Sequence, residues 1–128
     1  MTVDKNIPIL IVDDYKTMLR IIRSLLKQLG FENVDEATDG GMAMDKLRER
    51  TFGLIISDWN MEPVTGFELL KSVRANEGMK NIPFILITAE SKTENVVAAK
   101  QAGVSNYIVK PFNAETLKTK LASVLGPF

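Results

Sequence analysis

Carboxylate, hydroxyl and ammonium groups lie at the ends of four short apolar runs in this 128-residue sequence. In chain order these residues are Asp13, Asp14, Asp58, Thr88 and Lys110. Three carboxylates packed together raise one another's pKa values unless a cation neutralises them. Mg²⁺ relieves that repulsion, because it binds oxygen ligands and is typically held by one or two carboxylates together with phosphate oxygens. The pattern therefore predicts a magnesium site with Asp14 and Asp58 as ligands and Asp13 acting through a water molecule.

The same residue types suit the transfer of a phosphoryl group. A carboxylate such as that of Asp58 can attack phosphorus and form an acyl phosphate. Phosphoryl transfer needs mainly positioning and neutralisation of charge. Mg²⁺ would cover one phosphoryl oxygen and Lys110 a second, as a point charge. The hydroxyl of Thr88, or a backbone N–H after the run that ends at Asp58, would cover the third.

Each of these residues also has an ordinary structural explanation. Asp14 could be the N-cap of a helix that begins at Tyr15, and Asp58 could be a turn aspartate. Lys110 could be a surface lysine, and Thr88 a β-branched strand residue. The placement of all of them at strand ends favours one shared site over four unrelated explanations.

The composition excludes several kinds of chemistry. The sequence contains no cysteine and no histidine, which excludes disulfides, thiol nucleophiles, Ser-His triads and histidine metal ligands. Sixteen basic residues balance sixteen acidic ones, so we expect neither nucleic acid nor a membrane as the main partner. The N-terminus has no signal-peptide pattern, and we expect a cytoplasmic protein.

Apolar runs alternate with helical patterns along the whole sequence. We expect strands at residues 7–12, 34–37, 54–57, 83–88 and 106–109. Helices are expected at residues 15–29, 41–50, 67–75, 93–102 and after Asn113, which would cap the last one. Wholly apolar strands separated by helices are typical of a parallel sheet covered on both faces. The pattern predicts one α/β domain over residues 1–128, with no output domain.

Ligand sites in such open sheets form beyond the carboxyl ends of the strands. The expected elements therefore bring all the polar groups named above to one edge of the sheet.

At four segments the sequence resembles the receiver domains of two-component response regulators. The segments are Val12-Asp13-Asp14, Ser57-Asp58-Trp59-Asn60-Met61, Thr88-Ala89-Glu90 and Val109-Lys110-Pro111-Phe112. The similarity extends over essentially the whole chain. It implies a doubly wound, flavodoxin-like (βα)5 fold whose five parallel strands have the order 2-1-3-4-5.

The resemblance also implies roles for individual residues. Asp58 would accept the phosphoryl group from a histidine kinase. Asp13, Asp14 and Asp58 would bind Mg²⁺ together with the backbone carbonyl of Asn60.

Further residues match positions that respond to the phosphoryl group in this family. Thr88 and Lys110 would bind it, and Thr88 and Tyr107 would form the switch that changes conformation. The alternative for Tyr107 is a static, half-buried aromatic residue of a strand. Asn60 and Glu90 match positions that tune hydrolysis of the acyl phosphate.

The sequence departs from the family pattern in one loop. The family commonly has proline four residues after the acceptor aspartate, whereas this chain has Glu62 there and proline at Pro63. The distance to Gly66 is unchanged, so we expect the chemistry to be retained and the backbone path of the loop to differ. Glu62 also adds a carboxylate that could affect metal affinity or the choice of partner.

The resemblance implies a stand-alone, monomeric messenger of chemotaxis rather than an enzyme. Its partners would be a chemotaxis histidine kinase, the flagellar motor switch protein and a phosphatase, and it would lose its phosphoryl group by hydrolysis. The output face would comprise the last two helices and the fifth strand. The alternative within the family is a phosphate sink or phosphorelay intermediate of another pathway.

Two other classes fit the residues less well. Phosphatases of the haloacid dehalogenase type need a second aspartate two residues after the nucleophile as acid and base, and this chain has Asn60 there. Flavin-binding flavodoxin-like modules need a phosphate-binding loop rich in hydroxyl groups and glycine after the first strand, where Asp13 and Asp14 lie.

Overall fold

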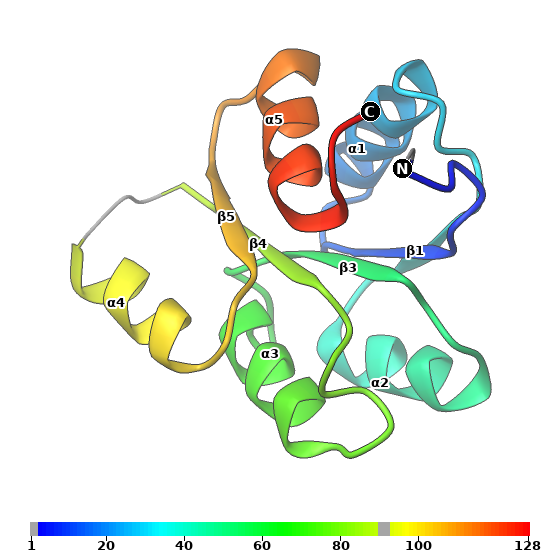
Figure 1. Ribbon diagram of the computed structural model, residues 1–128. Coiled ribbons are helices and arrows are strands. Elements are labelled where there is room, and N and C mark those ends of the chain that lie inside the picture. Colours follow the sequence, from blue (N-terminus) through cyan, green and yellow to red (C-terminus); the bar gives the residue numbers. More distant parts are fainter. Residues whose placement is uncertain (1–2, 90–92) are drawn as a thin grey trace.

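A computed structural model describes residues 3–89 and 93–128 (Figure 1). Its centre is a parallel sheet with the strand order β2-β1-β3-β4-β5. The strands are β1 (Ile9–Val12), β2 (Val34–Ala37), β3 (Leu54–Asp58), β4 (Phe84–Thr88) and β5 (Asn106–Val109). The predicted order of the strands is confirmed.

Helices cover both faces of the sheet. They are α1 (Lys16–Gln28), α2 (Gly40–Glu49), α3 (Gly66–Ala75), α4 (Thr93–Gln101) and α5 (Ala114–Leu125). Helices α1 and α5 lie on one face, and α2, α3 and α4 lie on the other (Figure 1). No helix in the described ranges combines the length and apolar character needed to cross a bilayer.

The strands read as continuous apolar runs because both of their faces are buried. Leu10 and Val12 of β1 pack with α2 and α3, while the alternate residues Ile9 and Ile11 pack with α1 and α5. Successive side chains of a strand point to opposite faces. One four-residue strand thus contributes to two separate cores, which hold the helices in place on either side.

Local signals in the sequence set the ends of several helices. The Asn113 side chain accepts a hydrogen bond from the backbone N–H of Thr116 at 2.9 Å, which confirms the predicted cap of α5. Thr65 and Glu68 form a reciprocal capping box at the start of α3. Gly30 follows α1 with a φ of +97°, a conformation that glycine adopts without steric penalty.

Prolines account for two shifted strand boundaries. The first strand begins at Ile9 rather than at residue 7, and the fourth begins at Phe84 rather than at residue 83. In each case the residue before the strand is a proline, Pro8 or Pro83, which has no N–H for the ladder. The third strand is one residue longer than predicted and includes Asp58.

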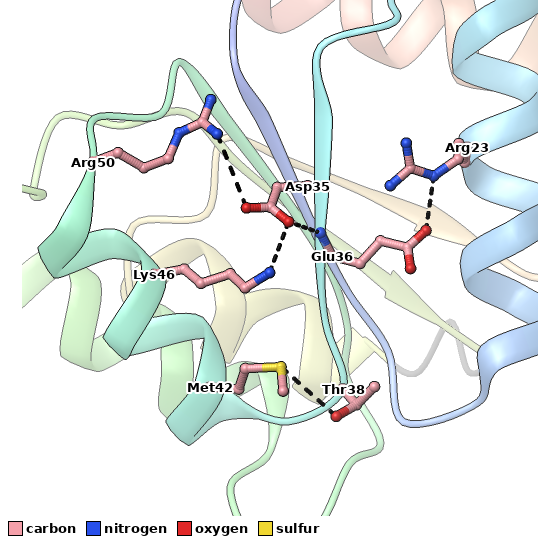
Figure 2. Close-up of polar contacts among 7 residues, drawn as sticks. All are labelled: Arg23, Asp35, Glu36, Thr38, Met42, Lys46 and Arg50. Atoms are coloured by element: carbon pink, nitrogen blue, oxygen red, sulfur yellow. Dashed lines mark hydrogen bonds and ion pairs between the residues drawn. The ribbon is translucent and has the colours of Figure 1, made fainter.

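Ion pairs connect the edge strand β2 to the two helices beside it (Figure 2). Asp35 lies 2.7 Å from Lys46 of α2 and 4.0 Å from Arg50, and Glu36 lies 2.8 Å from Arg23 of α1. Partly exposed pairs of this kind contribute little to stability. Their charged side chains lie on the edge strand of the sheet, and charges there disfavour pairing with a strand of another molecule.

Candidate functional site

Three carboxylates meet at the carboxyl ends of β1 and β3. One oxygen from each of Asp13, Asp14 and Asp58 lies within 4.8 Å of the others. The register explains the meeting, because Val12 at the end of β1 pairs with Ser57, the residue before Asp58. Asp13 is 1% exposed and Asp58 is 4% exposed, whereas Asp14 is open to solvent. The predicted proximity of the three carboxylates is therefore confirmed.

Asp13 has a hydrogen bond that orients it. Its Oδ1 accepts a hydrogen bond from the backbone N–H of Tyr15 at 2.9 Å. The N-cap of α1 is Tyr15, and no side chain caps that helix. The interpretation of Asp14 as a helix N-cap is thus wrong, and its carboxylate remains at the surface of the acidic cluster.

Lys110 supplies a positive charge next to Asp58. Its Nζ lies 3.0 Å from Asp58 Oδ1, which defines an ion pair. The Lys110 ammonium is therefore the charge partner of this buried oxygen. The backbone N–H of Lys110 donates to the carbonyl of Thr88 at 2.8 Å, which ties the end of β5 to the end of β4.

Two buried carboxylate oxygens have no hydrogen-bond donor among the described residues. They are Asp13 Oδ2 and Asp58 Oδ1. Buried polar atoms in folded proteins are nearly always satisfied, so this pair indicates a site that a ligand completes. An all-oxygen set of donors suits a hard divalent cation such as Mg²⁺.

The electrostatics of the carboxylates agree with that fit. Burial raises the pKa of Asp13 to about 6, and the neighbouring charge of Asp58 adds to the rise. Burial also raises the pKa of Asp58, although the ammonium of Lys110 opposes the rise. A divalent cation would stabilise the ionised form of both groups.

A glycine allows the loop after β3 to fold back against the site. The backbone N–H of Gly66 donates to the carbonyl of Trp59 at 2.9 Å, and the N–H of Trp59 donates to Ile87 at 2.8 Å. A Cβ at Gly66 would lie 2.0 Å from the backbone oxygen of Asp58. In the sequence Gly66 was interpreted only as a marker of loop length, and its steric role was missed. The available signal was a glycine directly before the helix expected at residues 67–75.

A hollow of about 350 Å³ lies beside the acidic cluster. It is lined by Asp14, Asn60, Met61, Glu62 and Thr65. Asn60, predicted to provide a carbonyl ligand, and Glu62, the departure from the family pattern, both border this hollow. Its volume is near the lower end of the range for small-molecule sites.

The remaining predicted residues lie on or beyond the neighbouring strands. Thr88 is the last residue of β4 and is 7% exposed. Tyr107 of β5 is half-buried, and Lys120 Nζ lies 5.0 Å from the centre of its ring. Glu90 lies outside the described residues. The phosphoryl-binding, switching and hydrolysis-tuning roles of these residues stay predictions.

Comparison with known proteins assigns the fold and site to a class. The family model of the response regulator receiver domain matches residues 9–122. This chain belongs to that family. Over 121 residues it is 50% identical to the chemotaxis protein CheY-3 of Vibrio cholerae serotype O1, covering 94% of this chain and 93% of that protein.

Solved structures agree with this assignment. The chain matches the chemotaxis protein CheY4 of Vibrio cholerae with a TM-score of 0.87 and 38% identity, over 94% of this chain and 99% of the other. It also matches the receiver domain of a sensor histidine kinase from Pseudomonas aeruginosa with a TM-score of 0.85 and 26% identity, over 94% and 98% of the two chains. That structure holds a magnesium ion coordinated in its active-site cleft.

Proposed function

We propose that this chain is a stand-alone chemotaxis response regulator in which Asp58 accepts a phosphoryl group from a histidine kinase in a Mg²⁺-dependent reaction. One observation carries the proposal. The buried carboxylate of Asp58 lies within 4.8 Å of the carboxylates of Asp13 and Asp14 and 3.0 Å from the Lys110 ammonium. The chain acts as a switch that is modified and reset rather than as an enzyme with a small-molecule substrate.

The protein groups have separate tasks in the transfer. An oxygen of Asp58 forms the new bond to phosphorus, while the bond from phosphorus to the imidazole nitrogen of the donor histidine breaks and that nitrogen keeps the electron pair. Lys110 balances the charge of one phosphoryl oxygen, and the Thr88 hydroxyl donates to another. Asp13, Asp14, Asp58 and the Asn60 carbonyl would hold Mg²⁺, which would neutralise further negative charge when bound.

The output of the switch is a change at β5 and the helices α4 and α5. Thr88 moves toward the phosphoryl group, and Tyr107 turns inward into the space left free. The altered face then binds the flagellar motor switch protein in the cytoplasm. The 50% identity to a chemotaxis protein supports this output over other pathways. A modification acts at a distance in this way only if it biases an element that has two conformations.

Trp59, the only tryptophan, provides the direct test, because it follows Asp58 and its ring stacks on Phe67 with centroids 5.1 Å apart. Its fluorescence is recorded while Mg²⁺ and then acetyl phosphate are added, with intact mass measured on wild type and Asp58→Asn. We expect a Mg²⁺-dependent change and one added phosphoryl group that the variant lacks. Absence of both would leave the acidic cluster a purely structural feature.

A capture experiment separates the messenger from a phosphate sink. Wild type and Asp58→Asn are immobilised under phosphorylating conditions and exposed to purified motor switch protein. Capture by phosphorylated wild type alone supports the messenger. Phosphorylation without capture would favour a phosphate sink or a phosphorelay intermediate.

A further inference from the structure

Glu62 lies in a loop whose two ends are fixed beside the phosphoryl-acceptor site. Hydrogen bonds from Trp59 to Ile87 and from Gly66 to Trp59 hold the base of the loop. The capping box of Thr65 fixes the entry into α3. Glu62 itself is exposed and borders the hollow of about 350 Å³ that it shares with Asp14. Its position next to the entrance of the site is therefore set by the fold.

Among the residues that the structure describes, the charged side chains that line this hollow are both acidic. They are Asp14 and Glu62, and the hollow's other lining residues, Asn60, Met61 and Thr65, are uncharged. The positive charge of Lys110 is paired with Asp58 Oδ1 at 3.0 Å. A small anion that approaches through the hollow thus meets two negative charges before it reaches a compensating cation. Charges of one sign around a concave surface change the local concentration and the association rate of charged ligands.

From this arrangement, and resting on the function proposed above, we infer that Glu62 is a specificity-determining residue that disfavours dianionic small-molecule phosphoryl donors at Asp58. A small donor contacts the protein only at the site and its immediate surroundings, where Asp14 and Glu62 lie. A protein donor has additional contacts outside the hollow, so the same repulsion is a smaller part of its total binding free energy. Glu62 thereby favours the protein kinase as the source of the phosphoryl group.

Two small donors that differ in charge separate this effect from general damage to the site. Acetyl phosphate carries two negative charges near neutral pH, and phosphoramidate carries one net negative charge. With either donor an Asp58 oxygen bonds to phosphorus, and the bond from phosphorus to the acetate oxygen or to the nitrogen breaks. Acetate leaves with the electron pair, or ammonia leaves after the nitrogen has been protonated. The ratio of the two rate constants therefore reports the charge at the entrance.

The experiment measures both bimolecular rate constants by Trp59 fluorescence at low and high salt, in the presence of saturating Mg²⁺. The variants are Glu62→Gln, Glu62→Lys and Glu62→Asp, with Glu49→Gln as the control. Glu49 is an exposed residue at the end of α2, outside the lining of the hollow, so its variant loses the same net charge.

We expect Glu62→Gln to raise the ratio of the acetyl phosphate rate to the phosphoramidate rate about two- to threefold at low salt, the effect of one unit charge across roughly 8 Å of water. Glu62→Lys should raise it further, Glu62→Asp and Glu49→Gln should leave it unchanged, and high salt should reduce every difference. If wild type is phosphorylated normally but the ratio is unchanged in Glu62→Gln and Glu62→Lys, the inference about Glu62 is overturned and the proposed function is not. Failure of wild type to accept a phosphoryl group from either donor would overturn the proposed function as well.

Discussion

Gly66 and the backbone oxygen of Asp58 lie so close together that no side chain fits between them. A Cβ on Gly66 would be 2.0 Å from that oxygen, well inside van der Waals contact. The first residue of α3 therefore packs against the backbone of the proposed acceptor residue. This contact fixes where β3 ends and where the following loop turns.

The first prediction is that Gly66→Ala damages both the fold and the site. The added methyl group must push α3 away from the end of β3, and overpacking of this kind typically costs about 1–3 kcal/mol of unfolding free energy. Urea denaturation should show the loss. The acetyl phosphate rate should fall, because the Asp58 carboxylate moves with its backbone.

Gly78→Ala is the matched control for that change. A Cβ there would meet its nearest neighbour, Asn76 Oδ1, at 3.5 Å, an ordinary contact. We expect near-native stability and phosphorylation for this variant. Equal behaviour of the two variants would contradict the proposed steric role of Gly66.

The second prediction concerns the pH dependence of the metal-free protein. Burial raises the pKa of Asp13 from 3.8 to about 6 in the folded state. Between these two pKa values the folded state thus binds more protons than the unfolded state. The contribution of Asp13 to the free energy of unfolding is therefore fully present below pH 3.8 and is lost as pH rises through about 6. A shift of this size corresponds to at most about 3 kcal/mol.

Asp13→Asn should therefore stabilise the protein at pH 7 in the presence of EDTA, with little effect near pH 3.5. The Asn Oδ1 can still accept the hydrogen bond from Tyr15. Asp14→Asn is the control, because it removes the same charge from an exposed position. Denaturation curves across this pH range provide the measurement, and equal stability of wild type and Asp13→Asn at pH 7 would argue against an ionised, buried Asp13.

Much of the site could be predicted because strand ends are visible in a sequence. Each buried strand is a short apolar run, and a polar residue marks its carboxyl end. Parallel pairing then places Asp13, Asp58, Thr88 and Lys110 along one edge without any knowledge of distances. The composition added a strong constraint, since a chain without histidine or cysteine must use oxygen and lysine groups.

Other features depend on distances between parts of the backbone and could not be predicted in this way. The steric role of Gly66 follows from its close approach to the backbone oxygen of Asp58, which cannot be inferred from the sequence alone. Asp14 fits the N-cap preferences of a helix, yet α1 begins one residue later than expected and has Tyr15 at its N-cap. The unusual Glu62 was visible in the sequence, but its place in the lining of a hollow beside Asp14 was not.

The third prediction is that Lys110→Gln binds Mg²⁺ more tightly while it accepts the phosphoryl group more slowly. The ammonium lies 3.0 Å from Asp58 Oδ1, so it competes with a cation for the same carboxylate. Removing one positive charge near a divalent ion in a solvated site should tighten binding about tenfold. The same charge is needed to neutralise a phosphoryl oxygen, so the acetyl phosphate rate should drop.

Trp59 fluorescence titrations with Mg²⁺ test this prediction. Lys46→Gln is the control, because Lys46 is paired with Asp35 of the edge strand β2 (Figure 2) and not with a carboxylate of the acidic cluster. Unchanged or weaker Mg²⁺ binding in Lys110→Gln would show that the ion pair does not compete with the metal.

The fourth prediction is that Tyr107 samples two orientations before phosphorylation. The ring is half-buried, packs against the core on the face of the sheet that carries α2, α3 and α4, and has Lys120 Nζ 5.0 Å from its centre. A cation over an aromatic ring at a partly exposed site contributes about 0.5–1 kcal/mol. Lys120→Ala should therefore reduce the equilibrium ratio of the observed orientation to the alternative one about two- to fivefold.

Fluorine NMR of 3-fluorotyrosine protein measures this population, because Tyr15 is the only other tyrosine and its exposed ring serves as an internal reference. Lys118→Ala is the control, since Lys118 lies over Phe128 at 5.6 Å and its loss changes the net charge equally. The Tyr107 signal should shift toward its phosphorylated value in Lys120→Ala and stay in place in Lys118→Ala. A Tyr107 ring that keeps one buried environment in both the free and the phosphorylated protein would make it a static strand residue, and the switch would then have to act through another element.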